Sequence, residues 1–398
     1  MDSIRRIKSS QLTTGMYLTE LGEQLAQASG LKARGLVTRD ETVNLVQQSG
    51  VTELYIDIAK GSDCADSEPV PAAVRAQLSA GPTLAEPASF AAELKNASDV
   101  RDKALNLIQE AMQDVKMGRG FDTGAVDVIT TEVIQSLDSN QNALTSLMRL
   151  RNMDSYLLEH STNVAVLMGI LAKSLGVNRD ELHQLVFGAF VHDVGKILVP
   201  EQVLNKPGRL DATEWQEMKR HVDYGVDSLK TIDGITGVAM EICEQHHERL
   251  DGTGYPYNLS AEQISAHGRM AAVVDVYDAV TANRVYHAGI EPSVALKRML
   301  EWTGTHLDRE LVYQLIRCIS VYPAGAWVML SSGLVALVQE PNLKKPTRAK
   351  VLLVYDSKRR VKLDEQVVDL VTSTRFGEIK FAVSPIDYQL DIGNYLKG

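Results

Sequence analysis

The sequence predicts a mainly α-helical protein, in which a helical bundle lies between a small α+β domain and a β-rich C-terminal extension. Apolar residues recur at helical spacing through most of residues 90–310, forming one stripe per helix. Residues 51–58 instead alternate between apolar and polar side chains, as in a strand with one buried face. Residues 327–338 form two apolar runs around Ser332 and Gly333, which is the pattern of a β-hairpin.

The chain is expected to consist of four consecutive segments. Residues 1–61 form a compact accessory domain, which has no cluster of ionisable residues that indicates catalysis. Residues 62–89 form a linker, because four prolines and many Ala, Ser and acidic residues interrupt regular structure there. Residues 90–310 form the helical domain, and residues 311–398 form the β-rich extension.

Composition is that of an ordinary globular protein, which we expect to be cytoplasmic. The formal net charge of −10 is opposite in sign to the basic face that binds a nucleic-acid polymer. No apolar run reaches the ~18 residues of a membrane helix, and the N-terminus lacks the apolar core of a signal peptide. The three cysteines are far apart and in no metal-ligand spacing, so we expect no disulfide framework.

All nine histidines lie between residues 160 and 306, so this region has a chemical role that the two ends do not share. Helical periodicity places several of them near helix ends, where side chains of different helices can converge. The expected helical segments and their polar residues are 156–175 with His160, the helix after Asn178 with His192 and Asp193, 213–221 with His221, 237–247 with His246 and His247, and 268–282 with Asp275 and Asp278.

These residue types indicate a site for divalent metals, which can serve the hydrolysis of a phosphodiester. Imidazoles and carboxylates together bind borderline-hard divalent metals, and an unpaired carboxylate in the apolar helix of Asp275 would cost several kcal/mol to bury. Two metals ~3.5–4 Å apart can activate water, neutralise the phosphoryl oxygens and assist the leaving alkoxide. The candidate ligands, which suit two octahedral sites with open positions, are His160, His192, Asp193, His221, His246, His247 and Asp275.

The order of these residues resembles the HD-GYP family of HD-superfamily phosphohydrolases. The resemblance is carried by His160, His192-Asp193-x-Gly195-Lys196, Lys219-Arg220-His221, the string from His246 through Gly254-Tyr255-Pro256, and Asp275-Val276-Tyr277-Asp278-Ala279. Members of this family hydrolyse the bacterial second messenger cyclic di-GMP. Residues 1–61 resemble the small domain of unknown function that often precedes HD-GYP domains.

The resemblance implies that the seven ligands divide between two metals. One metal would be held by His160, His192, Asp193 and Asp275, and the second by His221, His246 and His247, with Asp193 as the bridge. The family implies iron or manganese, whereas the ligand types alone also permit zinc, cobalt or nickel. Family members with a third metal carry Glu at the position of Tyr156, so we expect two metals.

The resemblance also implies two cations near the phosphate. Lys196 is the expected catalytic lysine beside Asp193, where it reaches a phosphate oxygen or the attacking water. Arg284 matches the phosphate-binding arginine of the family. The family usually has Pro next and a basic residue after the following Tyr, but this chain has Val285 and His287 there, which changes the expected grip on the phosphate.

Two roles stay open for the loop that contains Tyr255. The phenol could stack on a guanine or donate a hydrogen bond to it, or the loop could buttress the site and dock a partner. Glu248, Arg249 and Asp251 are expected to form a salt-bridge network that orients the adjacent histidine pair.

The sequence therefore favours a metal-dependent phosphodiesterase that converts cyclic di-GMP to linear pGpG, GMP or both. The alternative is a weakly active or inactive HD-GYP module that acts as a cyclic di-GMP receptor or a protein-interaction domain. Other signalling proteins are candidate partners for residues 1–61 or for the loop at Tyr255. The sequence leaves open whether the chain forms a homodimer.

Overall fold

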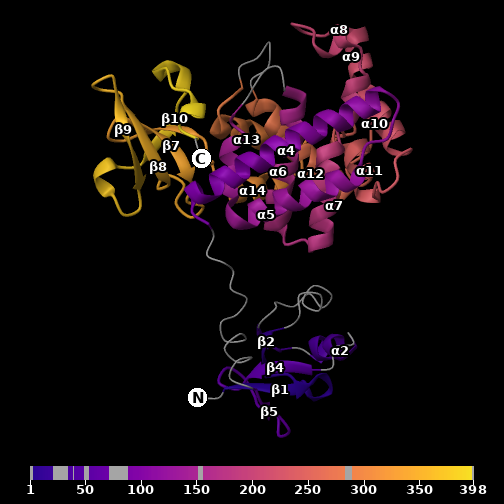
Figure 1. Cartoon of the computed structure of the whole chain (residues 1–398), viewed down its shortest axis with the longest axis vertical. Coiled ribbons are helices and arrows are strands. Elements are labelled where there is room, and N and C mark those ends of the chain that lie inside the picture. The colour runs from indigo at the N-terminus through magenta and orange to yellow at the C-terminus, as the bar shows by residue number, and fades with distance from the viewer. Residues whose placement is uncertain are drawn as a thin grey trace. The chain divides into compact units, whose positions relative to one another are not determined.

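The structure, a computed structural model, describes residues 3–20, 35–38, 40–48, 53–70, 88–150, 156–282 and 289–396. Its internal contacts divide the chain into two compact units, Met1–Glu86 and Pro87–Gly398. The fold class expected from the sequence is confirmed, since helices form the centre of the second unit and sheets occur at both ends of the chain (Figure 1).

The first unit is a small sheet with one helix. The antiparallel sheet has the strand order β3-β2-β4-β1-β5. Ile7, Leu18, Val46 and Ile56 are buried in its core, and Val46 comes from the helix α2. The elements are β1 (Ile4–Lys8), the 3-10 helix η1 (Ser9–Gln11), β2 (Tyr17–Glu20), β3 (Gly35–Leu36), α2 (Asp40–Gln48), β4 (Glu53–Asp57) and β5 (Glu68–Pro69).

Strand β5 lies inside the stretch that composition predicts as a linker. It pairs with β1, placing Pro69 opposite Arg5 at the edge of the sheet. An edge strand tolerates proline because the missing N–H has no partner strand on its outer side. The small unit therefore extends beyond the expected boundary at residue 61.

The second unit begins with four helices, each started by a side-chain cap where the cap is described. Ser89, Asp122 and Asn178 each accept a hydrogen bond from a backbone N–H in the first turn of the helix that follows. The helices are α4 (Phe90–Lys116), α5 (Thr123–Leu147, with a kink at Asn140), α6 (Tyr156–Leu175) and α7 (Arg179–Val191). Helix α6 is buried along most of its length, which makes it the central helix of the bundle.

The remaining helices complete the bundle around α6. They are the 3-10 helix η3 (Val194–Leu198), α8 (Glu201–Leu204), α9 (Ala212–Lys219), α10 (His221–Leu229), α11 (Gly237–Gln245), α12 (Ala266–Thr281), α13 (Pro292–Glu301) and α14 (Arg309–Ile319). The expectation that His221 ends the helix of Trp215 is wrong. Arg220, with ψ of −11° instead of about −42°, separates α9 from α10, so His221 is the first residue of a new helix.

The C-terminal sheet is antiparallel, with the strand order β10-β6-β7-β8-β9. Its strands alternate between two cores: Leu337 and Val335 of β7 join the core of the helical bundle, whereas Ala336 and Val338 join a separate core on the other face. The elements are β6 (Trp327–Leu330), β7 (Leu334–Glu340), β8 (Lys350–Asp356), β9 (Val361–Asp369), η4 (Thr374–Phe376), β10 (Ile379–Ala382), η5 (Pro385–Tyr388) and η6 (Ile392–Asn394).

Among the described residues, every helix is too short or too polar to span a bilayer.

Candidate metal centre

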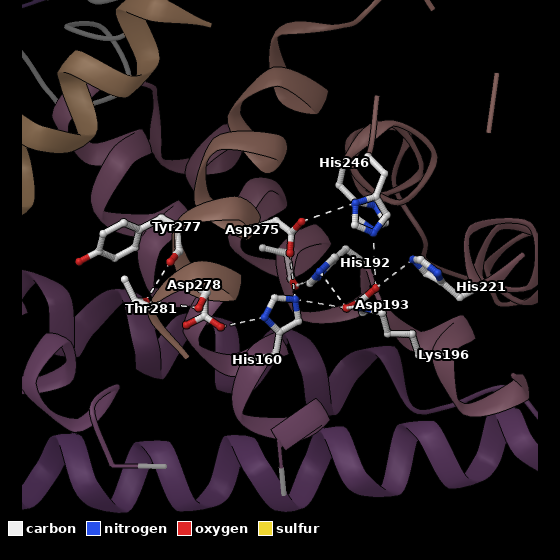
Figure 2. Close-up of polar contacts among 12 residues, drawn as sticks. His160, His192, Asp193, Lys196, His221, His246, Asp275, Tyr277, Asp278 and Thr281 are labelled. Atoms are coloured by element: carbon white, nitrogen blue, oxygen red, sulfur yellow. Dashed lines mark hydrogen bonds and ion pairs between the residues drawn. The ribbon is translucent and has the colours of Figure 1, made fainter. Parts of the chain in front are cut away.

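The seven candidate ligands from five parts of the chain come together in the helical unit. All of them except His247 are labelled in Figure 2. His160 comes from α6, His192 and Asp193 from the end of α7, and Asp275 from α12. His221 starts α10, and His246 and His247 follow α11. The ligand atoms form two groups, each with all its atoms within 4.8 Å of one another: Asp193, His221, His246 and His247, and His160, His192 and Asp275. Only His247 is not fully buried.

Close backbone contact between η3 and α10 brings Asp193 to His221. A Cβ atom on Gly195 would lie 2.1 Å from the carbonyl oxygen of His221 and 2.3 Å from the backbone nitrogen of Gly225. Only glycine fits at position 195, because real Cβ atoms do not come so close to backbone atoms. The result is a distance of 3.4 Å between Asp193 Oδ1 and His221 Nε2.

Three imidazoles are held by hydrogen bonds from Nδ1 to backbone carbonyls. His192 donates to Ala189 over 2.7 Å, His221 to Met218 over 2.7 Å, and His246 to Cys243 over 2.9 Å. A carbonyl oxygen only accepts, so Nδ1 carries the proton in each ring and Nε2 keeps a free lone pair.

These Nε2 atoms point into the centre as hydrogen-bond acceptors without a donor. Within the described part of the chain, Nε2 of His192, His221 and His246 and Oδ1 of Asp193 are buried and have no hydrogen-bond partner. Each unsatisfied buried acceptor costs about 1–3 kcal/mol. Four converging acceptors without donors are what a divalent cation would satisfy, so the residues fit a metal.

The shifted pKa values of His192, His221, His247 and the two carboxyls favour metal binding at neutral pH. Burial lowers the pKa of His221 to about 3, and it also lowers the pKa of His192 and of His247. Burial opposes ionisation of Asp193 and Asp275. The ammonium of Lys196 outweighs it at Asp193, and the hydrogen bond from His160 outweighs it at Asp275, so the pKa of both carboxyls is held low. Neutral imidazoles and ionised carboxylates are the forms that coordinate metals.

His160 differs from the other histidines because carboxylates surround it. Its Nδ1 is 2.8 Å from Oδ2 of Asp278, and its Nε2 is 3.0 Å from Asp275 and 3.3 Å from Asp193 (Figure 2). Burial alone would lower the pKa of His160, but Tyr156 and the three carboxylates raise it well above the ordinary value. Asp278 is fully buried and is absent from the residues that the sequence predicts as functional. Its position one helical turn after Asp275, in the same apolar helix, is the signal that could have revealed it.

Lys196 reaches into the same centre. Its ammonium group forms an ion pair with Oδ2 of Asp193, and the side chain is only 16% exposed. Burial alone would lower the pKa of Lys196, but the carboxylates of Asp193 and Asp275 raise it, so the residue is a cation at neutral pH. The structure thus places the expected catalytic lysine beside the candidate ligands.

The loop that follows His247 folds back over the site. The backbone N–H of Tyr255 donates to the carbonyl of His247 over 3.2 Å. The Tyr255 ring lies 4.6 Å from the imidazole of His247, at an interplanar angle of 32°. A Cβ atom on Gly254 would lie 2.4 Å from the backbone nitrogen of Arg249, so this turn requires glycine.

Glu248 braces this loop by hydrogen bonds. Its buried carboxylate accepts from the backbone N–H groups of Tyr257 over 2.7 Å and of Leu259 over 3.0 Å. In the described residues it has no ion pair with Arg249, so the expected salt-bridge network is replaced by a carboxylate that binds the loop backbone. The other expected phosphate residues, Arg284 with Val285 and His287, lie outside the described residues.

Two family profiles match the chain. The profile described as an HD domain matches residues 137–311, and a domain of unknown function, DUF3391, matches residues 4–126. A cyclic di-GMP phosphodiesterase from Pseudomonas aeruginosa is 34% identical over 92% of this chain and 89% of its own length. A 3'3'-cGAMP-specific phosphodiesterase from Vibrio cholerae is 37% identical over 39% of this chain and 30% of its own length.

One solved structure, of an HDG"Y"P protein from Bdellovibrio bacteriovorus, is 16% identical to this chain, with a TM-score of 0.48 over 78% of this chain and 98% of that one. The family assignment comes from the Pseudomonas relative, which matches nearly the whole chain, and from the HD profile over the region of the seven ligands. The resemblance seen in the sequence is confirmed: the chain belongs to the HD-GYP family of HD-domain phosphohydrolases, with a DUF3391 domain at its N-terminal side.

Proposed function

We propose that this chain is a metal-dependent phosphodiesterase that hydrolyses cyclic di-GMP. The observation that carries the proposal is the set of orphaned acceptors at one buried point, Nε2 of His192, His221 and His246 together with Oδ1 of Asp193. The names of the relatives supply the substrate class, since the one that spans the chain is a cyclic di-GMP phosphodiesterase. A cytoplasmic location belongs to the same proposal, because the substrate is a second messenger inside bacteria.

The two groups of ligand atoms support a centre with two metals. The first would be held by His160, His192 and Asp275, and the second by His221, His246 and His247, with Asp193 shared between them. Asp193 suits a shared position because its Oδ2 lies 3.3 Å from His160 and its Oδ1 lies 3.4 Å from His221. When bound, two such ions supply an activated water and neutralise charge on the phosphoryl group.

The two proposed metal ions are iron or manganese. The set of five imidazoles and two carboxylates contains no thiolate, and burial raises the pKa of the Cys243 thiol well above its ordinary value, which keeps it protonated. Mixed nitrogen and oxygen ligands suit these metals.

The residues of the chain then orient the reaction. Lys196, a buried cation next to Asp193, neutralises charge on a phosphoryl oxygen or orients the attacking water by donating a hydrogen bond. Asp278 fixes the ring of His160 by accepting from its Nδ1. The Tyr255 loop places an aromatic ring beside the candidate ligand His247. Arg284 is the proposed second contact to the phosphate.

The reaction adds one water to a P–O bond of the ring. The phosphorus gains a hydroxyl oxygen, the P–O3' bond breaks, and the departing 3' oxygen takes up a proton. One such step gives linear pGpG, and a second step on the other phosphodiester gives two GMP. We propose pGpG, GMP or both as products.

The direct test is elemental analysis of anaerobically purified full-length protein, combined with chromatographic assay of cyclic di-GMP hydrolysis on the same sample. About two metals per chain with pGpG or GMP as product is the expected result. Activity that survives complete removal of metal would disprove the proposal.

A second candidate function is a cyclic di-GMP receptor with little turnover. It is favoured by Val285 and His287, which replace residues that the family usually has beside its phosphate-binding arginine. Full metal loading and tight cyclic di-GMP binding without product would support this candidate. In that case Val285→Pro and His287→Arg are the first changes to make, to test whether they restore turnover.

A further inference from the structure

Trp215 is an exposed tryptophan that lies next to the Tyr255 loop and contributes little to the core of the protein. Trp215 is 45% exposed on α9, a helix in which no residue is buried. Most large aromatic side chains are buried because exposure of their apolar surface is unfavourable. An aromatic ring that is exposed beside a catalytic centre is therefore a candidate for ligand contact.

Polar contacts hold α9 in place, so the Trp215 ring is not needed for its folding. The Asp211 side chain caps the helix by accepting hydrogen bonds from the backbone N–H groups of Thr213 and Glu214, and the Glu214 carboxylate accepts one from the backbone N–H of Asp211. Glu214 also forms an ion pair with Lys206. Helices α8 and α9 extend outward from the rest of the helical unit (Figure 1), and the Trp215 side chain is exposed.

The Trp215 ring continues a line of rings that begins in the metal centre. The centre of the Tyr255 ring lies 4.6 Å from the centre of the imidazole of the candidate ligand His247. The centre of the Trp215 ring lies 6.0 Å from that of Tyr255, and the two rings meet edge to face at 83°. Lys219, one turn after Trp215 on α9, has its ammonium 5.9 Å from the centre of the Tyr255 ring. Within the described part of the chain, this lysine has no carboxylate partner. We call Trp215, Lys219 and Tyr255 the aromatic rim.

We propose that Trp215 is a substrate-binding residue whose indole stacks on a purine base of the cyclic dinucleotide, while Lys219 donates to that base or to the phosphate that is not being cleaved. This inference rests on the proposed function and extends it to the determinants of base recognition. A cyclic dinucleotide has two bases attached close to its two phosphates. When one phosphate lies in the metal centre, a base therefore falls beside the Tyr255 loop, where the rim offers an aromatic face and a cation.

The first test compares two substrates with Trp215→Leu in the full-length, Mn²⁺-loaded protein. Loss of one base–aromatic stack should raise KM for cyclic di-GMP about fivefold or more. The substrate bis(p-nitrophenyl) phosphate has no purine, so its kcat/KM should change less than about twofold. Trp215→Phe should restore most of the affinity for cyclic di-GMP. The matched control is Tyr313→Leu, which removes an aromatic ring of similar exposure (42%) from α14 and should change neither substrate.

An unchanged KM for cyclic di-GMP in Trp215→Leu would overturn the inference. An equal loss with both substrates would overturn it too, because the ring would then act on the metal centre rather than on the base. Circular dichroism and the melting temperature of each variant should match those of the parent, since Trp215 is exposed and α9 buries nothing.

The second test does not depend on turnover. The chain has three tryptophans, and Trp215 is the exposed one, whereas Trp327 is 3% exposed and Trp302 is half-buried. Rapid mixing with cyclic di-GMP should quench tryptophan fluorescence in the parent and should lose most of that signal in Trp215→Phe. If cyclic di-GMP quenches the fluorescence of the parent but is not hydrolysed, the aromatic rim is supported and the proposed activity is disproved. If the parent hydrolyses cyclic di-GMP without a signal from Trp215, the activity stands and the rim is disproved, and a parent that shows neither signal nor turnover disproves both.

Discussion

Asp278 accepts a hydrogen bond from Nδ1 of His160 over 2.8 Å, and both side chains are completely buried. This bond directs Nε2 of His160 toward Asp275 and Asp193, the two carboxylates of the candidate metal centre. A carboxylate behind a ligating histidine sets the orientation of its ring and raises its basicity. Asp278 is therefore a positioning residue for the centre.

Asp278→Asn is expected to lower metal affinity or kcat about 10- to 100-fold. The amide oxygen still accepts the hydrogen bond but no longer carries the charge that makes His160 basic. Metal titration at fixed pH, measured alongside cyclic di-GMP hydrolysis, checks this. Asp364→Asn, an exposed carboxylate on β9, is the matched control and should be silent. Parent-like metal affinity in Asp278→Asn would show that the bond to His160 is only structural.

The double variant His192→Ala and Asp193→Ala should abolish turnover and lower the metal content of the protein, because it removes one imidazole and the shared carboxylate. Helical content should persist, since the apolar core around α6 is untouched. His183→Ala, which changes a histidine outside the seven ligands, is the control. Elemental analysis measures the metal content and circular dichroism measures the helical content. Retained hydrolysis would refute the ligand assignment.

Lys196→Gln should lower kcat by at least about 100-fold while metal content stays near that of the parent. Its ammonium is close to the centre through Asp193 but is not itself a ligand. The comparison needs metal content and kcat on the same sample, with the exposed Lys103→Gln as control. Equal kcat in Lys196→Gln and the parent would remove this lysine from the mechanism.

Tyr156→Glu should create capacity for a third metal. The Tyr156 ring lies against the His160 ring, with centroids 6.0 Å apart and planes at 12°, so a carboxylate at this position would face the centre. The expected result is a rise in metal content above that of the parent in anaerobic elemental analysis. Tyr156→Phe should bind as many metals as the parent. An unchanged count in Tyr156→Glu would mean that this position does not set the number of metals.

Asp138 should contribute stability only above acidic pH. Burial raises its pKa, but Lys173 on α6 and Arg179 on α7 outweigh burial and lower it. A carboxyl whose folded pKa is depressed stabilises the fold above its unfolded pKa of about 3.9, and this stability is lost as the pH falls through the folded pKa.

Asp138→Asn should therefore reduce the free energy of unfolding at pH 7 by less than about 1 kcal/mol, because the side chain is 43% exposed and solvent screens the pairs. The difference from the parent should shrink as the pH falls below the unfolded pKa of about 3.9. Urea unfolding of both proteins at pH 7 and at the lower pH measures this difference in the free energy of unfolding. A difference that grows at low pH would contradict the sign of the argument.

Much of the helical unit could be predicted because its signals are local. The helix expected over 156–175 matches α6, and the helix expected after Asn178 matches α7. The boundary between α9 and α10 could not be predicted, because Arg220 keeps helical φ and only its ψ departs. Strand β5 could not be predicted either, because two residues in a proline-rich stretch become a strand only through pairing with β1.

The sequence by itself determined the residue types, most of the helices that carry them and the family, because these depend on local periodicity and on the order of motifs along the chain. Only the tertiary structure decided which nitrogen of His192, His221 and His246 faces the centre, and that Asp278 accepts a hydrogen bond from His160. It also placed Trp215 beside Tyr255, forty residues away in sequence. These relationships depend on contacts between helices that are far apart in the chain, and periodicity along one helix carries no information about the partner it will meet.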